Sequence, residues 1–139
     1  MRQDDGVVDV PSSYPVAETI DRLEELVRAR SLIVFARIDF AGDAARAGLT
    51  LPPMQSLLFG NPRAGTPLLA ASPHTGLDLP LRALAWEDDD GAVRVSYSSP
   101  EWVVARHGLP EELAKNLATV RALVSEAAGA PREGAPALH

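Results

Sequence analysis

Residues 59–100 constrain the fold most, because turn and breaker residues divide this stretch into short elements. An apolar run ends just before Asn61-Pro62, and the residue before a proline avoids helical geometry, so a turn is expected there. Thr66-Pro67 is typical of a helix cap and first helical turn. This part of the chain therefore predicts the end of a strand, a turn and a short helix capped by Thr66.

The same stretch continues into a hairpin. Residues 81–86 and 93–97 are rich in apolar and β-branched residues, and an acidic segment that ends in Asp90-Gly91 separates them. An Asp-Gly pair between two such runs is a strong hairpin signal. We therefore expect two antiparallel strands here.

The rest of the chain predicts two long helices and further strands. Residues 15–30 and 110–128 carry apolar side chains at helical spacing. Residues 32–40 alternate as a strand does, with Leu32, Val34, Ala36, Ile38 and Phe40 on one face. This order predicts an α+β fold, in which an antiparallel sheet of four to five strands has two main helices packed on one face.

The composition favours one folded domain over residues 1–128. Apolar residues make up 46% of the 139 and charged residues 23%, as in ordinary globular proteins. Residues 129–139 are rich in proline, glycine and alanine, and we expect a disordered tail. Because the sheet is covered by helices on one face only, a second copy is the simplest cover for the other, and we expect a homodimer.

The net charge, the length of the apolar runs and the cysteine content argue against several partners and locations. The net charge of −6 argues against nucleic acid, whose binding proteins normally present a basic face. No apolar run approaches the roughly 20 residues of a membrane helix, so no membrane association is expected. The chain has no cysteine and no signal-peptide pattern at its N-terminus, which fits a cytoplasmic location.

Several short motifs between about residue 7 and residue 128 resemble those of a known family. They are Phe59-Gly60-Asn61-Pro62, Gly65-Thr66-Pro67-Leu68, Asp78-Leu79-Pro80-Leu81, Trp86-Glu87-Asp88, Val95-Ser96-Tyr97 and Arg106-His107-Gly108. In combination they are similar to the domain of unknown function 302 family. The resemblance implies a small bacterial domain, similar in outline to the TATA-box-binding-protein fold and tending to pair as dimers. It implies no reaction, cofactor or catalytic residue.

One loop has the chemistry of an anion site. Asn61, Gly65 and Thr66 favour exposed turn and cap geometry, and the positive end of the following helix points at them. Arg63 adds a guanidinium group. The alternative is that these residues only shape a turn and cap a helix, which accounts for each residue type without any ligand.

Two further residues are candidates for the same ligand. His107 is a candidate base at neutral pH, although its place at a predicted helix end equally fits a structural cap. Arg37 lies at the polar end of its strand, where an ion pair across strands is the alternative. No catalytic triad is readable, and the acidic segment at residues 87–90 lacks the order of a calcium loop. We therefore expect no catalytic residue, no metal and no cofactor.

From the sequence we interpret the chain as a small, soluble, homodimeric binding or accessory domain. The alternative is an enzyme, or a regulator that binds a small anionic ligand such as phosphate. That alternative would use the loop at residues 61–66 together with His107 or Arg37. Convergence of these side chains in one concave pocket would favour the second interpretation, and their dispersal would favour the first.

Overall fold

The computed structural model describes residues 5–129. Five strands form one sheet in the order β1-β5-β4-β3-β2, and each strand is antiparallel to its neighbours. The strands are β1 (Val7–Ser12), β2 (Ile33–Asp39), β3 (Met54–Gly60), β4 (Leu81–Glu87) and β5 (Val93–Ser98). The predicted tail at residues 129–139 lies outside the described residues, except for Gly129, which ends the last helix in left-handed geometry.

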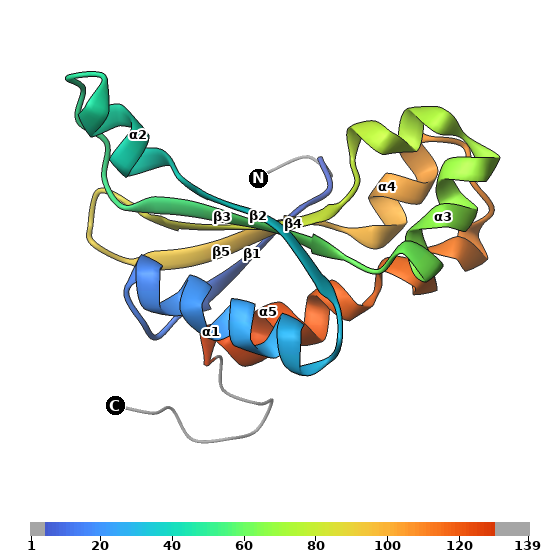
Figure 1. Cartoon of the computed structure of the whole chain (residues 1–139), viewed down its shortest axis with the longest axis horizontal. Helices are drawn as coiled ribbons and strands as arrows, with labels where there is room; N and C mark the ends of the chain where they lie inside the picture. Colours follow the sequence, from blue (N-terminus) through green and yellow to red (C-terminus); the bar gives the residue numbers. More distant parts are fainter. Residues whose placement is uncertain (1–4, 130–139) are drawn as a thin grey trace.

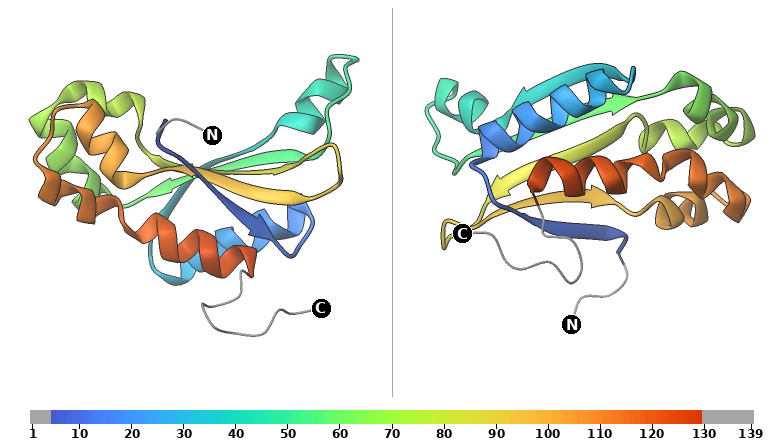
Figure 2. Two further views of the ribbon diagram at one scale, coloured as in Figure 1. Left: turned by 180° about the vertical axis from the view of Figure 1, so that it is seen from behind. Right: turned by 90° about the horizontal axis from the view of Figure 1, so that it is seen from below.

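Two helices, α1 (Val16–Ala29) and α5 (Thr119–Ala128), lie side by side under one face of the sheet (Figures 1 and 2). Their apolar sides pack on the inward side chains of the sheet and exclude water from them. We call this the main core; it contains Ile20, Leu23, Leu57, Phe59, Val95, Leu123 and Val124, all at most 1% exposed. The predicted α+β fold with two helices on one face is confirmed.

Four short helices form a separate lobe beyond one end of the sheet (Figure 1). They are α3 (Pro62–Ala71), the 3-10 helices η1 (Pro73–Leu77) and η2 (Glu111–Leu117), and α4 (Pro100–Arg106). Their buried side chains form a second cluster, which we call the lobe core: Leu68, Val103, Val104, Leu109, Ala114 and Leu117. A further short helix, α2 (Phe40–Arg46), stands at the opposite end of the sheet.

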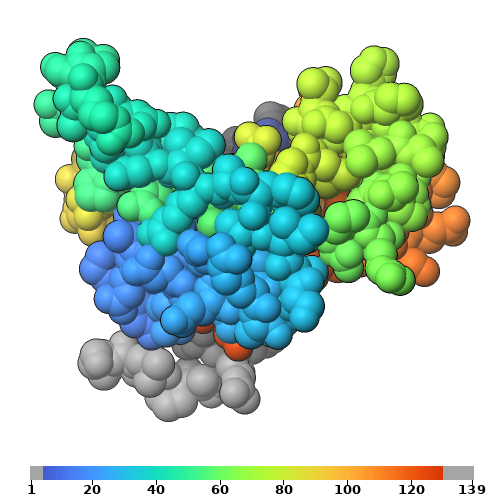
Figure 3. All heavy atoms as spheres, in the orientation of Figure 1, coloured from blue at the N-terminus to red at the C-terminus, as the bar shows by residue number. Residues whose placement is uncertain are grey.

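No long helix within residues 5–129 covers the other face of the sheet (Figure 1). Because side chains alternate along a strand, the neighbours of the core residues point to this open face. Leu58, Leu84 and Trp86 lie there and are only half-buried. The space-filling view shows the surface hollowed between α2 on one side and the lobe on the other (Figure 3). The open face is therefore the floor of a concave surface with an apolar centre.

Strand β2 does not keep the alternation that the sequence predicts. A bulge between Val34 and Ala36 shifts the register, so that Val34 pairs with Phe59 on the core side while Ala36 pairs with Leu58 on the open side. An extra residue in one strand reverses the faces of all that follow. Arg37 is thereby directed to the helix-covered face.

The predicted helix over residues 110–128 is broken into two. Residues 111–117 form the 3-10 helix η2, and α5 begins only at Thr119. Leu117 belongs to the lobe core while Val120 belongs to the main core, so one apolar stripe in the sequence serves two clusters. The change of helix type near Ala118 allows this, since 3-10 and α geometry present side chains at different angles.

Candidate functional site

The loop at residues 61–66 folds differently from its prediction. Helix α3 begins at Pro62, and Asn61 is its cap, with the Asn61 side-chain oxygen accepting a hydrogen bond of 3.0 Å from the Arg63 backbone N–H. Thr66 therefore lies inside the helix and does not cap it. Pro62 and Pro67 both suit the first position of a helix. Pro62 also follows Asn61, however, and asparagine caps a helix well. The prediction of a Thr66 cap is wrong for that reason.

Helix α3 forms one wall of a pocket of about 460 Å³. The pocket lies where the lobe meets the adjoining ends of β2 and β3, between the main core and the lobe core. Its lining comes from several elements: Leu32, Phe35, Gly60, Asn61, Pro62, Ala64, Gly65, Thr66, Leu69, Gly76, Leu79, Pro80, Leu81, Asn116, Leu117 and Thr119. Phe35 is 52% exposed, so part of this wall faces the solvent.

The lining is mostly apolar, and no Asp, Glu, Lys, Arg or His belongs to it among the described residues. Four polar residues contribute: Asn61, Thr66, Asn116 and Thr119. The Asn116 side-chain N–H group donates a hydrogen bond of 3.0 Å to the Ala64 backbone oxygen, which ties the second half of η2 to α3. This arrangement can enclose an apolar molecule and offer it a few uncharged hydrogen-bonding groups.

Three of the six predicted ligand residues meet at this pocket, and three do not. Asn61, Gly65 and Thr66 line it. Arg63 is on the same helix but exposed and outside the lining. The guanidinium group that the sequence offered to an anion is thus absent from the pocket wall.

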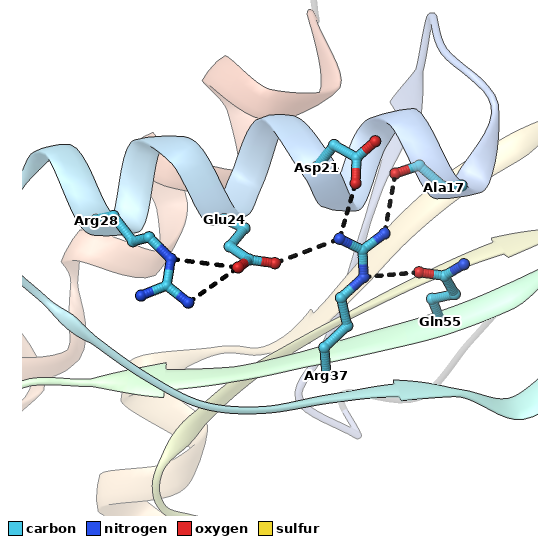
Figure 4. A network of polar contacts seen from close by, with 6 residues as sticks. All are labelled: Ala17, Asp21, Glu24, Arg28, Arg37 and Gln55. Carbon is cyan, nitrogen blue, oxygen red and sulfur yellow. Dashed lines mark hydrogen bonds and ion pairs between the residues drawn. The ribbon is translucent and has the colours of Figure 1, made fainter.

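Arg37 is engaged on the helix-covered face of the sheet (Figure 4). Its guanidinium group donates to the side chains of Gln55, Asp21 and Glu24 at 3.0, 2.8 and 3.3 Å, and to the backbone oxygen of Ala17 at 3.3 Å. These bonds connect β2 and β3 with α1. The group is occupied by protein acceptors, and its role in this structure is to tie the helix to the sheet.

Glu24 stands between two arginines in the same network (Figure 4). Hydrogen bonding from Arg28 lowers the pKa of the Glu24 carboxyl most. Burial raises this pKa and hydrogen bonding from Arg37 lowers it again, so that it lies below its ordinary value of 4.5. The carboxylate is therefore ionised at neutral pH and continues the link between α1 and β2.

His107 lies at the end of α4, as expected for a structural cap position. Its side chain is 5% exposed, and its Nε2 lies 2.5 Å from one oxygen of Asp78. Arg106 donates to that oxygen at 2.9 Å and to the other oxygen of Asp78 at 3.0 Å. Asp78 lines a smaller pocket of about 130 Å³ that shares Leu81 and Leu117 with the larger one. The imidazole itself lines neither pocket.

The acidic segment at residues 87–90 and the neighbouring Trp86 have structural partners. Asp88 accepts hydrogen bonds from the backbone N–H groups of Asp90 and Ala92 and so closes the hairpin; its pKa is lowered, chiefly by the Ala92 bond. On the open face, the Trp86 indole N–H donates to Ser96 at 2.8 Å. The acidic segment therefore shapes a turn, and the Trp86 ring is held on the open face by its bond to Ser96.

Sequence reasoning missed most of the pocket wall. Leu32, Phe35 and Leu69 lie in segments assigned to a strand or a helix, and apolar periodicity does not distinguish a pocket wall from a filled core. Asn116 also gave no signal, since a lone asparagine in a predicted helix is unremarkable. In the sequence, only the loop that begins at Asn61 indicated a candidate site at this end of the fold.

None of the helices within residues 5–129 has both the length and the apolarity needed to cross a bilayer. Two Brucella proteins, from B. suis biovar 1 and B. abortus biovar 1, both named fluoride-specific ion channel FluC 1, are each 45% identical to this chain over 106 residues. The match covers 76% of this chain, but only 42% and 39% of those proteins. The chain thus spans less than half the length of these relatives.

A solved structure and a family profile agree with the fold. The crystal structure of an uncharacterized conserved protein DUF302 from Bacillus stearothermophilus superposes with a TM-score of 0.72, at 21% identity, over 90% of this chain and 97% of that one. At this identity the likeness shows a shared fold. The profile described as Domain of unknown function DUF302 matches residues 8–127. Since that match covers most of the sequence, the chain belongs to the DUF302 family.

Proposed function

We propose that this chain is a ligand-binding domain whose ligand occupies the pocket between α3 and the ends of β2 and β3. The pocket volume of about 460 Å³ is the observation that carries the proposal. Pockets for small organic molecules have volumes of roughly 300–1,000 Å³ and mostly apolar walls with a few polar groups. No set of side chains in the described residues resembles a catalytic constellation around it, so binding is favoured over catalysis.

A thermal-shift screen tests this function with wild type and Gly65→Leu. The panel contains phosphates, nucleotides, carboxylates, metal salts, alcohols and amides, because a compound that binds only the folded protein raises its melting temperature. We expect at least one compound to stabilise wild type and to lose that effect in Gly65→Leu, whose side chain fills the pocket. A panel in which no compound gives a pocket-dependent shift would contradict the function.

The functional unit in this proposal is a homodimer that pairs through the open face of the sheet. Leu58, Leu84 and Trp86 are half-buried there, and covering such apolar surface is favourable by roughly 25 cal/mol per Å². The concave shape between α2 and the lobe supports a specific rather than a flat contact (Figure 3). Phe35 belongs to the pocket wall and lies near Gly60 on this side, so pairing would also narrow the pocket entrance.

Sedimentation equilibrium tests the dimer. We expect wild type at micromolar concentration to exceed the 14.8 kDa of one chain, and Leu84→Glu to sediment as a monomer because it places a charge at the centre of the open face. Ala122→Glu, on the exposed side of α5, is the matched control and should remain dimeric. A wild-type monomer at all accessible concentrations would exclude this assembly.

An anion-binding regulator at the same loop is the alternative. It is supported by the presence of Asn61, Gly65 and Thr66 in one pocket wall, as that interpretation requires. It is weakened by the positions of Arg37 and His107, whose side chains are held by Asp21, Glu24 and Asp78. A charged compound that stabilises wild type in the same screen but neither Gly65→Leu nor Arg63→Ala would favour the alternative.

A second candidate function is an accessory role in fluoride resistance. The 45% identity to Brucella proteins named fluoride-specific ion channels supports it, with the chain corresponding to the part of those proteins that it matches. The pocket is far larger than a single fluoride ion, so in this role the domain would regulate or assemble with a channel rather than carry fluoride. Deleting the gene should lower the fluoride concentration that cells tolerate; unchanged tolerance would argue against this role.

A further inference from the structure

We infer that the pocket takes an uncharged, largely apolar organic molecule with one hydrogen-bonding end, and not an anion. The inference rests on the proposed binding function and names its ligand class. Three features of the described residues carry it: the donors at the start of α3, the character of the lining, and the glycines in the pocket wall.

The start of α3 has no free donor for an anion. Pro62, the first residue of the helix, has no N–H. The Arg63 N–H donates to the Asn61 side chain at 3.0 Å, and the N–H groups of Ala64 and Gly65 both donate to the Asn61 backbone oxygen at 2.9 Å. Anions bind at helix starts through unpaired N–H groups, and here those groups already have partners.

The lining offers no compensation for a buried charge. An ionised group that leaves water needs an opposite charge or several donors, whereas an uncharged group needs one or two hydrogen bonds. The pocket can supply the latter: Thr66 and Thr119 bring hydroxyl groups, and Asn116 uses its amide N–H on Ala64, which leaves its side-chain oxygen as an acceptor. Asn61, the fourth polar residue of the lining, already uses its side-chain oxygen on the Arg63 N–H, and the remaining lining residues are apolar.

Three glycines in the wall provide space rather than backbone freedom. Gly60, Gly65 and Gly76 all line the pocket, and none has a positive φ. A Cβ atom on each would meet its nearest neighbour at 3.6–3.7 Å, which is ordinary contact. Neither conformation nor packing requires glycine at these positions, and Gly65 within α3 lowers helix stability relative to alanine. Their missing side chains enlarge the pocket.

Paired probes of equal length test the ligand class. Amide NMR titrations use 1-octanol, octanoate and inorganic phosphate on the full chain. We expect 1-octanol to shift the amide signals of Gly60, Gly65 and Gly76, and octanoate to bind at least about tenfold more weakly because its charge is uncompensated in the pocket. Octanoate binding as tightly as 1-octanol, or phosphate shifting the same signals, would overturn the inference.

Pocket-filling variants locate the binding. Gly65→Leu should abolish the 1-octanol shifts, whereas Ala70→Leu, an exposed position on the same helix outside the lining, should retain them. Leu69→Trp fills the pocket from an exposed position and serves if Gly65→Leu does not fold. Shifts of 1-octanol that persist in a folded pocket-filling variant, or no shifts in wild type at millimolar probe, would also overturn the inference.

The same experiments separate this inference from the function on which it rests. If a charged compound binds and is lost in the pocket-filling variants, the neutral ligand class is wrong while the binding function stands. If no compound of the thermal-shift panel shows pocket-dependent binding, the proposed function itself fails.

Discussion

The main core and the lobe core bury similar side chains but differ in how completely they fill their space. The main core lies between regular strands and two helices, and its largest side chains are at most 1% exposed. The lobe core joins short helices whose ends are set by caps and prolines. The pocket lies along the seam between them and takes its walls from both, as Leu81 and Leu117 illustrate. Among the described residues, the larger pocket thus lies where the irregular lobe meets the regular sheet and helices.

The strongest effect is expected in the main core. Phe59→Ala removes a fully buried ring near the end of β3 and should lower the free energy of unfolding by about 3–5 kcal/mol. Urea denaturation followed by circular dichroism measures it. A loss below about 1.5 kcal/mol would mean that the main core can collapse around the space, and the contrast with the lobe would disappear.

A smaller effect is expected in the lobe core. Leu68→Ala removes a fully buried side chain of α3 and should cost about 2–3 kcal/mol, at the lower end for such changes, because the pocket beside it lets short helices adjust. Hydrogen exchange sharpens the comparison. We expect faster exchange in α3 and α4 with little change in α1, and equal acceleration in both regions would show that the two cores unfold as one unit.

The regular part of the fold was predictable from the sequence because its signals are local. The stripe of α1 and the Asp90-Gly91 hairpin each depend on neighbouring residues, and both elements are present. The bulge at Phe35 was not predictable, since nothing in an alternating apolar run marks where an extra residue enters. That single extra residue decides which face of the sheet Arg37 occupies. Arg37 therefore does not join the other predicted ligand residues at the pocket.

The candidate site was predictable in place but not in character. Asn61, Gly65 and Thr66 marked the loop, because turn and cap residues are recognisable locally. The distant walls, such as Leu32 and Asn116, come together only through the packing of the lobe on the sheet. Whether the start of α3 has free N–H donors likewise depends on which proline begins the helix. The sequence did not decide this, because Pro62 and Pro67, five residues apart, both suit a first helical position.

The tie between α1 and the sheet should give a modest, pH-dependent effect. Because the folded-state pKa of Glu24 is lowered, its contribution is fully present above the ordinary value of 4.5 and is lost as the pH falls through the folded value. Glu24→Gln should therefore lower stability at pH 7 by about 1 kcal/mol or less and flatten the acid side of the stability profile. Glu25→Gln, exposed on the same helix, is the control, and identical profiles for both variants would exclude a role for the network.

The smallest effect is expected at Arg63, and it is the most decisive for the site. Arg63 is exposed and outside the pocket lining, so Arg63→Ala should change the free energy of unfolding by no more than about 0.5 kcal/mol. If the ligand is uncharged, the affinity for 1-octanol should also stay the same, because the guanidinium group does not reach the wall. An anion site at the loop predicts otherwise: phosphate would bind wild type, and loss of a charge-assisted hydrogen bond would weaken it about tenfold or more. Calorimetric titration of both probes into wild type and Arg63→Ala separates the two, since a loss of phosphate affinity in the variant would place the charge of Arg63 in the site and return the seam between the cores to an anion-binding role.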